Sequence, residues 1–202
     1  MRFRTKNLKS ALTKVLLLVV FCMVSYTAFA KTIYVDGANN GIADGAEWAT
    51  AYKTVKAALA EAAVLVETEE FVEIWIRAGE YKEGEPMKMI NNVRIRGGFA
   101  GMETCKRQRI VGENETILSG EDRYRVVYNS FTLAEPLTSS AVLDSVTIAN
   151  GYSSDNPRGG GMYNFRASPT ITNCIFRENI VADYNTTSYG GGIYNRFSQS
   201  DN

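Results

Sequence analysis

A repeated pattern of short apolar segments in the second half of the chain restricts the fold more than any other feature. Residues 143–151 match residues 171–179, and both segments carry apolar side chains at their first, fourth and sixth positions. A glycine-rich hexapeptide also recurs, as GGGMYN at residues 159–164 and as GGGIYN at residues 190–195. Both motifs return within the period of about 20–50 residues that is typical of solenoids.

The repeating unit consists of short strands and turns. Val72, Ile74 and Ile76 alternate with polar or aromatic residues, which is the period of a strand. Further short apolar runs end in glycine, asparagine or serine. We therefore predict an all-β chain folded as a right-handed parallel β-helix, a solenoid in which each coil pairs in parallel with the next. Leu143, Val146 and Ile148 are then expected to lie over Ile171, Cys174 and Phe176.

One helix is predicted, at about residues 54–66. Tyr52, Val55, Leu59, Ala62 and Val66 recur at steps of three and four and form one apolar stripe. We expect this helix to cap the N-terminal coil. The domain is predicted to cover residues 31–202, with repeat units over about residues 141–202. It is expected to be incomplete at its C-terminal end, because no comparable cap follows the second GGG unit.

Residues 1–30 have the features of a secretory signal peptide. They hold five basic and no acidic side chains, then an apolar run at residues 15–24, and they end in Ala28-Phe29-Ala30. The apolar run is too short for a permanent membrane anchor. We expect cleavage after Ala30, a mature chain without a transmembrane span, and a secreted or cell-surface location associated with the outer membrane.

The composition of the mature chain excludes several function classes. Residues 31–202 hold 17 basic and 22 acidic side chains, and this acidic excess argues against nucleic acid as a partner. The chain has no histidine, which excludes Ser-His-Asp and Cys-His catalysis and histidine-bound zinc. Cys105 and Cys174 are predicted to be unpaired, because one lies in a polar stretch and the other takes an inward strand position.

Four residues are candidates for binding an acidic polysaccharide. Arg77, Arg94 and Arg96 alternate with inward residues and so are predicted to point outward, as is Trp75. A row of arginines could hold an acidic chain, and the tryptophan could stack on a sugar ring. The alternative is an ordinary outer face, with arginines paired to nearby carboxylates and the tryptophan covered by a loop or by the predicted helix.

A calcium site is a second possibility, in the turn-rich segment before the helix. Asp36, Asn40, Asp44 and Glu47 occupy positions one, five, nine and twelve of an EF-hand-like loop. Position three is Ala38, which cannot ligate, so the alternative is a turn that leads into the helix. No other cofactor and no catalytic residue is predicted.

Several segments resemble known proteins. Residues 34–36, 48–52, 73–81 and 97–101 resemble the N-terminal part of bacterial right-handed parallel β-helix proteins. The later units resemble the chlamydial polymorphic outer-membrane protein repeat, which pairs a GGA-plus-aliphatic motif with F-x-x-N. Residues 176–179 match the second motif, and the two GGG units match the first with a third glycine in place of alanine. The order of the pieces is similar to that of large surface proteins of the Bacteroidetes.

The resemblance implies an extracellular β-helix but no single activity. We expect a non-catalytic scaffold for adhesion or surface display, with extracellular polysaccharide or a host or cell surface as its partner. The alternatives are a polysaccharide-active enzyme, similar to pectate lyases or pectinesterases, and a carbohydrate-binding module, each with its site beyond residue 202.

Cleavage by signal peptidase is directly testable. N-terminal sequencing of the secreted protein should begin at Lys31, because Ala28 and Ala30 provide the small residues that the peptidase reads. A chain that keeps Met1 and stays in the membrane fraction would instead indicate an anchor.

Overall fold

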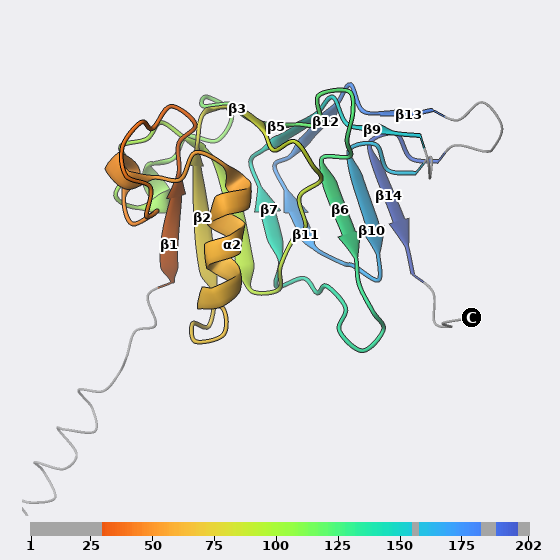
Figure 1. Cartoon of the computed structure of the whole chain (residues 1–202), viewed down its shortest axis with the longest axis horizontal. Coiled ribbons are helices and arrows are strands. Elements are labelled where there is room, and N and C mark those ends of the chain that lie inside the picture. Colours follow the sequence, from red (N-terminus) through yellow and green to blue (C-terminus); the bar gives the residue numbers. More distant parts are fainter. Residues whose placement is uncertain (1–29, 155–157, 183–188, 198–202) are drawn as a thin grey trace, which may run out of the picture.

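A computed structural model describes residues 30–154, 158–182 and 189–197 of the chain, and parallel β-strands dominate it (Figure 1). Sheet A has the strand order β1-β2-β4-β7-β11. Its strands are β1 (Lys31–Val35), β2 (Val72–Arg77), β4 (Val93–Phe99), β7 (Val142–Asp144) and β11 (Thr170–Thr172). Every strand pairing among the described residues is parallel. The all-β prediction is therefore confirmed.

Three smaller sheets complete the strand structure. Sheet B contains β3 (Gly79–Lys82), β5 (Thr116–Ser119), β8 (Thr147–Ala149) and β12 (Ile175–Arg177). Sheet C contains β6 (Val127–Ser130), β10 (Met162–Phe165) and β14 (Ile193–Arg196). A two-stranded sheet pairs β9 (Tyr152–Ser153) with β13 (Ile180–Val181). Two 3₁₀ turns lie in the loops, η1 (Trp48–Thr50) and η2 (Lys106–Gln108).

The chain visits these sheets in a repeating order. After β4, β7 and β11 in sheet A it forms a strand of sheet B and then a strand of sheet C. We call each such passage a circuit. Residues in successive circuits pair in the predicted register, with Leu143 opposite Ile171 and Ile148 opposite Phe176. Both pairs keep the spacing of the repeat that links residues 143–151 to residues 171–179.

The core lies between the sheets and is built from the inward residue of each strand. Ile95, Leu143 and Ile148 are completely buried, and Leu118 is 2% exposed. Ile171, Cys174 and Phe176 pack against this core from the last described circuit. Burial of such side chains is the main favourable contribution to folding, about 25 cal/mol per Å² of apolar surface.

Turns between the sheets also repeat from circuit to circuit. Ser145 and Asn173 take the same place in successive repeats, and both have left-handed backbones, with φ of 57° and 51°. The glycines are needed because stacked backbones approach closely. A Cβ atom on Gly160 would lie 2.4 Å from the carbonyl oxygen of Ile180, and one on Gly161 would lie 2.6 Å from that of Gly192. The GGG motif therefore has a steric role.

The predicted helix is present as α2 (Val55–Leu65). Thr54 caps it by accepting a hydrogen bond from the Ala57 amide at 3.2 Å. Glu83 accepts two more, from the amides of Val55 and Lys56. The helix lies in front of β2 in Figure 1, contacts β1 and β2, and packs its apolar side into the core. None of the described helices is long and apolar enough to cross a membrane.

A loop also covers the N-terminal end of sheet A, beside the helix that is expected to cap it. The free edge of β1 is covered by the turn-rich segment before the helix. Tyr34 donates its amide to the Gly45 carbonyl at 3.0 Å and accepts from the Tyr52 amide at 2.9 Å. Val35 and Tyr52 form a parallel bridge. The apolar stripe correctly predicted a helix, but it could not show that a loop would satisfy the strand edge.

Candidate functional site

Trp75 and Arg96 lie on the outer face of sheet A, and both side chains are largely covered. The Trp75 ring stacks on Phe99 with 4.7 Å between centroids, meets Tyr34 edge to face, and is 5% exposed. Its Nε1 donates to Glu73 at 2.7 Å. Trp48 packs against Tyr34 and Phe99 in the same cluster. Trp75 therefore offers almost no ring surface to a sugar, and the alternative of a covered tryptophan describes its position.

Arg96 belongs to a buried ionic cluster on the same face. Its guanidinium lies 2.6 Å from Asp144 Oδ2 and 3.4 Å from Glu73 Oε1. Arg109 reaches the same Asp144 oxygen at 2.8 Å from the loop that follows β4. The four side chains are 5–16% exposed. They hold the loop against the sheet and leave little surface for a ligand.

The pKa of the Asp144 carboxyl reflects this cluster. Burial by itself would raise it, but hydrogen bonds from Arg109, Asn173 and Ser145 outweigh burial and hold the pKa well below its usual range. The carboxylate is therefore ionised in the folded protein at neutral pH.

The other two predicted arginines lie elsewhere. Arg77 pairs with Asp36 at 2.7 Å, and this pairing raises the pKa of Arg77. The Arg94 guanidinium lies over the Phe71 ring, 3.8 Å from its centroid. The structure therefore brings Trp75 and Arg96 together around Glu73, but it does not build one arginine row.

The four predicted calcium ligands have separate environments. Asp36 accepts from the Ala38 amide and from Arg77, and Asn40 accepts from Lys53. Asp44 accepts hydrogen bonds from the Thr50 hydroxyl and the Ala46 amide, and these bonds lower its pKa. Glu47 precedes η1, but its side chain does not cap that turn. Within the described ranges, no three Cys, Asp or Glu side chains gather as a metal site would require. The segment matches the alternative of a turn leading into the helix.

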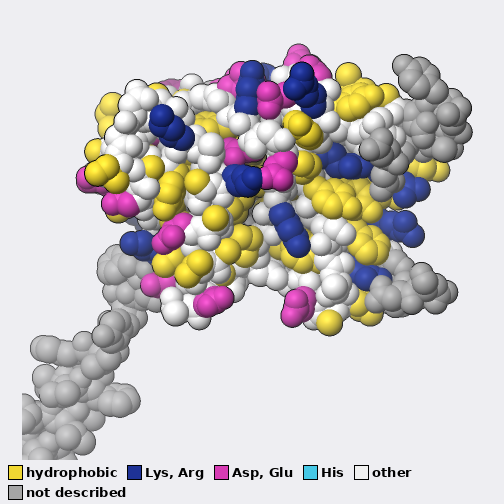
Figure 2. Space-filling model, viewed as in Figure 1, with side chains coloured by type: hydrophobic (Ala, Val, Ile, Leu, Met, Phe, Trp, Pro, Cys, Tyr) yellow, Lys and Arg dark blue, Asp and Glu magenta, His cyan; other side chains and the backbone are white. Residues whose placement is uncertain are grey.

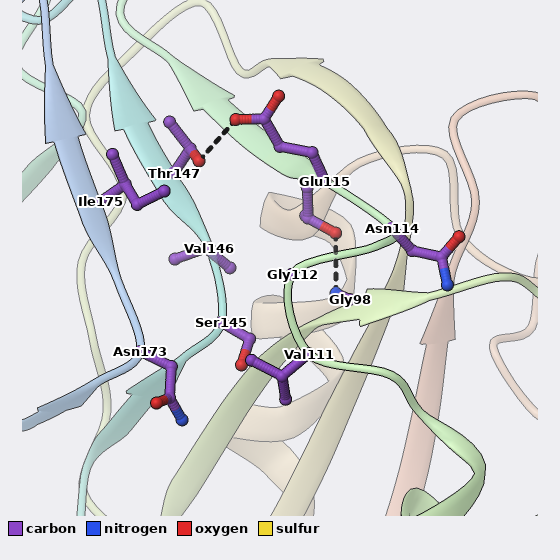
Figure 3. A pocket seen from close by; sticks show the side chains of 11 residues that line it. Gly98, Val111, Gly112, Asn114, Glu115, Ser145, Val146, Thr147, Asn173 and Ile175 are labelled. Carbon is purple, nitrogen blue, oxygen red and sulfur yellow. Dashed lines mark hydrogen bonds between the residues drawn. The ribbon is translucent and has the colours of Figure 1, made fainter.

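A cavity of about 230 Å³ lies where sheets A and B meet (Figure 3). Glu115 and Thr147 lie at one side and Ser145 and Asn173 at the other. Glu115 accepts from the Thr147 hydroxyl at 2.8 Å and pairs with Arg177 at 3.0 Å. Glu115 is the one acidic side chain among the lining residues, so this cavity lacks the carboxylate pair of a glycosidase.

Three tyrosines form a stack on the outer face of sheet C. Tyr128, Tyr163 and Tyr194 lie opposite one another on β6, β10 and β14. Their ring centroids are 5.1 and 5.7 Å apart, and the ring planes differ by 21° and 19°. We call these three residues the tyrosine ladder. Tyr128 is 37% exposed, and Tyr163, between its two neighbours, is 6% exposed.

A second ladder supports the first from inside. Asn129 donates its Nδ2 to Asn164 Oδ1, and Asn164 donates to Asn195 Oδ1, both at 2.8 Å. The chain of bonds begins at the Met89 amide, which donates to Asn129. Asn129 and Asn164 are buried, whereas Asn195 is exposed. Side-chain amides bonded in this way fix the register of the three strands, and so they fix the spacing of the tyrosines.

Cationic side chains surround the tyrosine ladder. The Arg125 guanidinium lies 5.4 Å from the Tyr128 ring, and that of Arg158 lies 5.6 Å from the Tyr194 ring. Lys88 and Arg196 are exposed nearby, over the rings of Phe131 and Phe165. Figure 2 shows the result, with dark blue side chains around a yellow area over sheet C. This basic, aromatic face is the best candidate for a functional site.

Sequence reasoning missed this face although its signal was present. The GGG motif linked Tyr163 to Tyr194, but no GGG precedes Tyr128. The shared element is a shorter pattern, an apolar residue followed by Tyr-Asn, which occurs at residues 127–129, 162–164 and 193–195. The step from the first of these to the second is longer than the step from the second to the third, so the three do not share one period.

No protein-family model matches this chain, and comparisons with curated proteins and with solved structures give no match either. Function is therefore inferred from the residues and their geometry.

The buried ionic cluster predicts a large effect of Asp144→Asn. Removing this carboxylate leaves Arg96 and Arg109 without their shared partner, so the free energy of unfolding at pH 7 should fall by about 3 kcal/mol. Asp122→Asn is the matched control, because Asp122 is exposed and asparagine tolerates its φ of 55°. Urea unfolding of both variants measures the difference.

The same cluster predicts a pH dependence. The ionised Asp144 carboxylate contributes fully to the free energy of unfolding above its pKa in the unfolded chain, about 3.9. This contribution is lost as the pH falls towards the lower pKa that Asp144 has in the folded protein. The difference in free energy of unfolding between wild type and Asp144→Asn should therefore become smaller as the pH is lowered from 7 to about 3. A gap that is the same at both pH values, or no larger than that for Asp122→Asn, would contradict the cluster.

Proposed function

We propose that this protein is a right-handed parallel β-helix that acts outside the cell as a non-catalytic, adhesin-like scaffold. Its partner in this proposal is extracellular polysaccharide or a host or cell surface. The repeating order of sheets and the parallel pairing of the sequence repeats support the β-helix. The basic head, apolar run and Ala-Phe-Ala end of residues 1–30 support secretion, although residues 1–29 lie outside the described part.

The tyrosine ladder is the observation that carries the functional part of the proposal. Its three rings are held in register by the asparagine ladder beneath them, so the contact surface is built before any partner arrives. A surface that is already ordered loses little conformational entropy on binding. Tyrosine and arginine are also the side chains that contribute most often to recognition surfaces.

The carboxylates support a structural role over a catalytic one. Asp144 and Glu73 contact arginines within the buried cluster, and Glu115 pairs with Arg177. A general acid or base must reach the proton that it transfers. These three groups instead stabilise the outer surfaces of sheets A and B.

An attachment assay tests the proposal. Beads coated with the secreted protein should adhere to layers of extracellular polysaccharide or to intact cells, and they should release no shortened sugar chains. Tyr128→Ala combined with Tyr194→Ala should reduce adhesion by at least about tenfold, as expected when central recognition residues are truncated.

Tyr124→Ala is the matched control for that assay. Tyr124 is 38% exposed, close to the 37% of Tyr128, but it lies outside the tyrosine ladder. Adhesion of this variant should equal that of the wild type. Release of shortened or unsaturated sugar products would favour the enzyme alternative, and equal losses in all variants would contradict a role for the ladder.

A further inference from the structure

We propose that the tyrosine ladder and the cations around it form a binding site for an acidic polysaccharide, a sugar polymer that carries carboxylate or sulfate groups. This inference rests on the proposed scaffold function and narrows its ligand to one chemical class. It also moves acidic-polysaccharide binding from sheet A, where the sequence indicated it, to sheet C.

The environment of the cations is the first argument. On sheets A and B, Arg77, Arg96, Arg109 and Arg177 each pair with a carboxylate. On the face of sheet C, Lys88, Arg158 and Arg196 have no ion pair with any described residue. They lie instead over aromatic rings, with 4.4–5.8 Å between the cation and the ring centroid.

This difference has a chemical consequence. A cation over a ring is attracted by the π-system, and this contact does not use up its N–H donors. Those donors can bond the oxygens of an incoming carboxylate or sulfate, and a guanidinium can do so with two parallel bonds. Lys88, Arg158 and Arg196 are therefore positioned by aromatic rings, while no carboxylate among the described residues pairs with them.

The orientation of the tyrosines is the second argument. Tyr163 has a stacked ring against each of its faces, so its edge is the part that is left to contact a ligand. A phenol hydroxyl lies at such an edge and donates one hydrogen bond while it holds its proton. The pKa of Tyr163 is raised, mainly by burial of its ring and to a lesser extent by the neighbouring Tyr128. Its phenol therefore stays protonated at neutral pH. Hydroxyl and guanidinium donors together favour an anionic ligand over an apolar one.

The repeat along the face is the third argument, and it favours a polymer. Neighbouring strands lie about 4.8 Å apart, so the tyrosine position recurs at short, regular intervals across three strands. Each interval resembles the length of one pyranose ring. A linear acidic polysaccharide can therefore place successive sugars against successive strands.

Isothermal titration of the secreted protein tests the ligand class. Polygalacturonate supplies carboxylates, chondroitin sulfate supplies both charged groups, dextran is the neutral polymer, and single-stranded DNA is an unrelated polyanion. We expect binding to the two acidic polysaccharides and none to dextran. The affinity should fall at least about tenfold when salt is raised from about 0.05 to about 0.5 M, because screening weakens exposed charges.

Paired variants locate the site. Lys88→Gln combined with Arg196→Gln should weaken binding to polygalacturonate about tenfold or more, since both side chains are exposed on the proposed face. Arg94→Gln is the matched control, because Arg94 also stacks on an aromatic ring but lies on sheet A. Its affinity should equal that of the wild type. Thermal unfolding of each variant checks that the fold is intact.

The outcomes separate this inference from the proposed function. Tight binding to dextran that is lost in the Tyr128→Ala, Tyr194→Ala variant would overturn the acidic ligand and keep the scaffold. Tighter binding to DNA than to either polysaccharide, or equal losses in the Arg94→Gln and Lys88→Gln, Arg196→Gln variants, would also overturn it. Beads that adhere to no polysaccharide and no cell would overturn the proposed function itself.

Discussion

Parallel hydrogen bonding between segments one repeat apart in the sequence is the constraint on which the other features of this structure depend. Each strand completes its backbone bonding with a strand one circuit earlier or later, so successive circuits must have nearly the same shape. The same requirement fixes the turns, where Ser145 and Asn173 share a left-handed conformation. It also places like side chains on top of one another. The two ladders of sheet C follow directly from this stacking.

The placement of charge then distinguishes the faces of the molecule. On sheet A, the loop after β4 returns over the strands, and Arg96, Arg109 and Asp144 are buried together beneath it. Mutual neutralisation within this cluster stabilises the fold, whereas Arg94 of the same sheet lies over the Phe71 ring. On sheet C, Lys88 and Arg196 are exposed over aromatic rings and pair with no carboxylate among the described residues. The proposal of an acidic ligand follows from this contrast between two faces of one chain.

Sequence periodicity predicted those parts of the fold that depend on local pattern. The register of Leu143 with Ile171, the helix after Thr54 and the unpaired state of Cys105 and Cys174 follow from alternation, stripe spacing and position, and the structure confirms them. Alternation also placed Trp75 and Arg96 on the outer side of their strands. It could not reveal that a distant loop covers that side, because covering is a tertiary contact with no periodic signal.

The candidate site was harder to predict for a related reason. Its defining residue, Tyr128, lies in a circuit that is longer than the next one, and no GGG motif precedes it. A longer loop between two strands changes their spacing in the sequence without changing how the strands stack. A search for one fixed period therefore misses the pairing of Tyr128 with Tyr163. The tripeptide of an apolar residue, tyrosine and asparagine is too short to stand out until the strands are aligned in space.

Through-hydrogen-bond couplings measured by NMR test the central claim most directly. The amides of Thr170, Ile175 and Ile180 donate to the carbonyls of Ala141, Val146 and Gly151, and each acceptor lies one circuit earlier in the chain. Scalar coupling between these three nitrogen–carbonyl pairs is the result that parallel stacking predicts. Coupling of the same amides to carbonyls within a local hairpin would contradict stacked circuits, and with them the two ladders of sheet C and the proposed site.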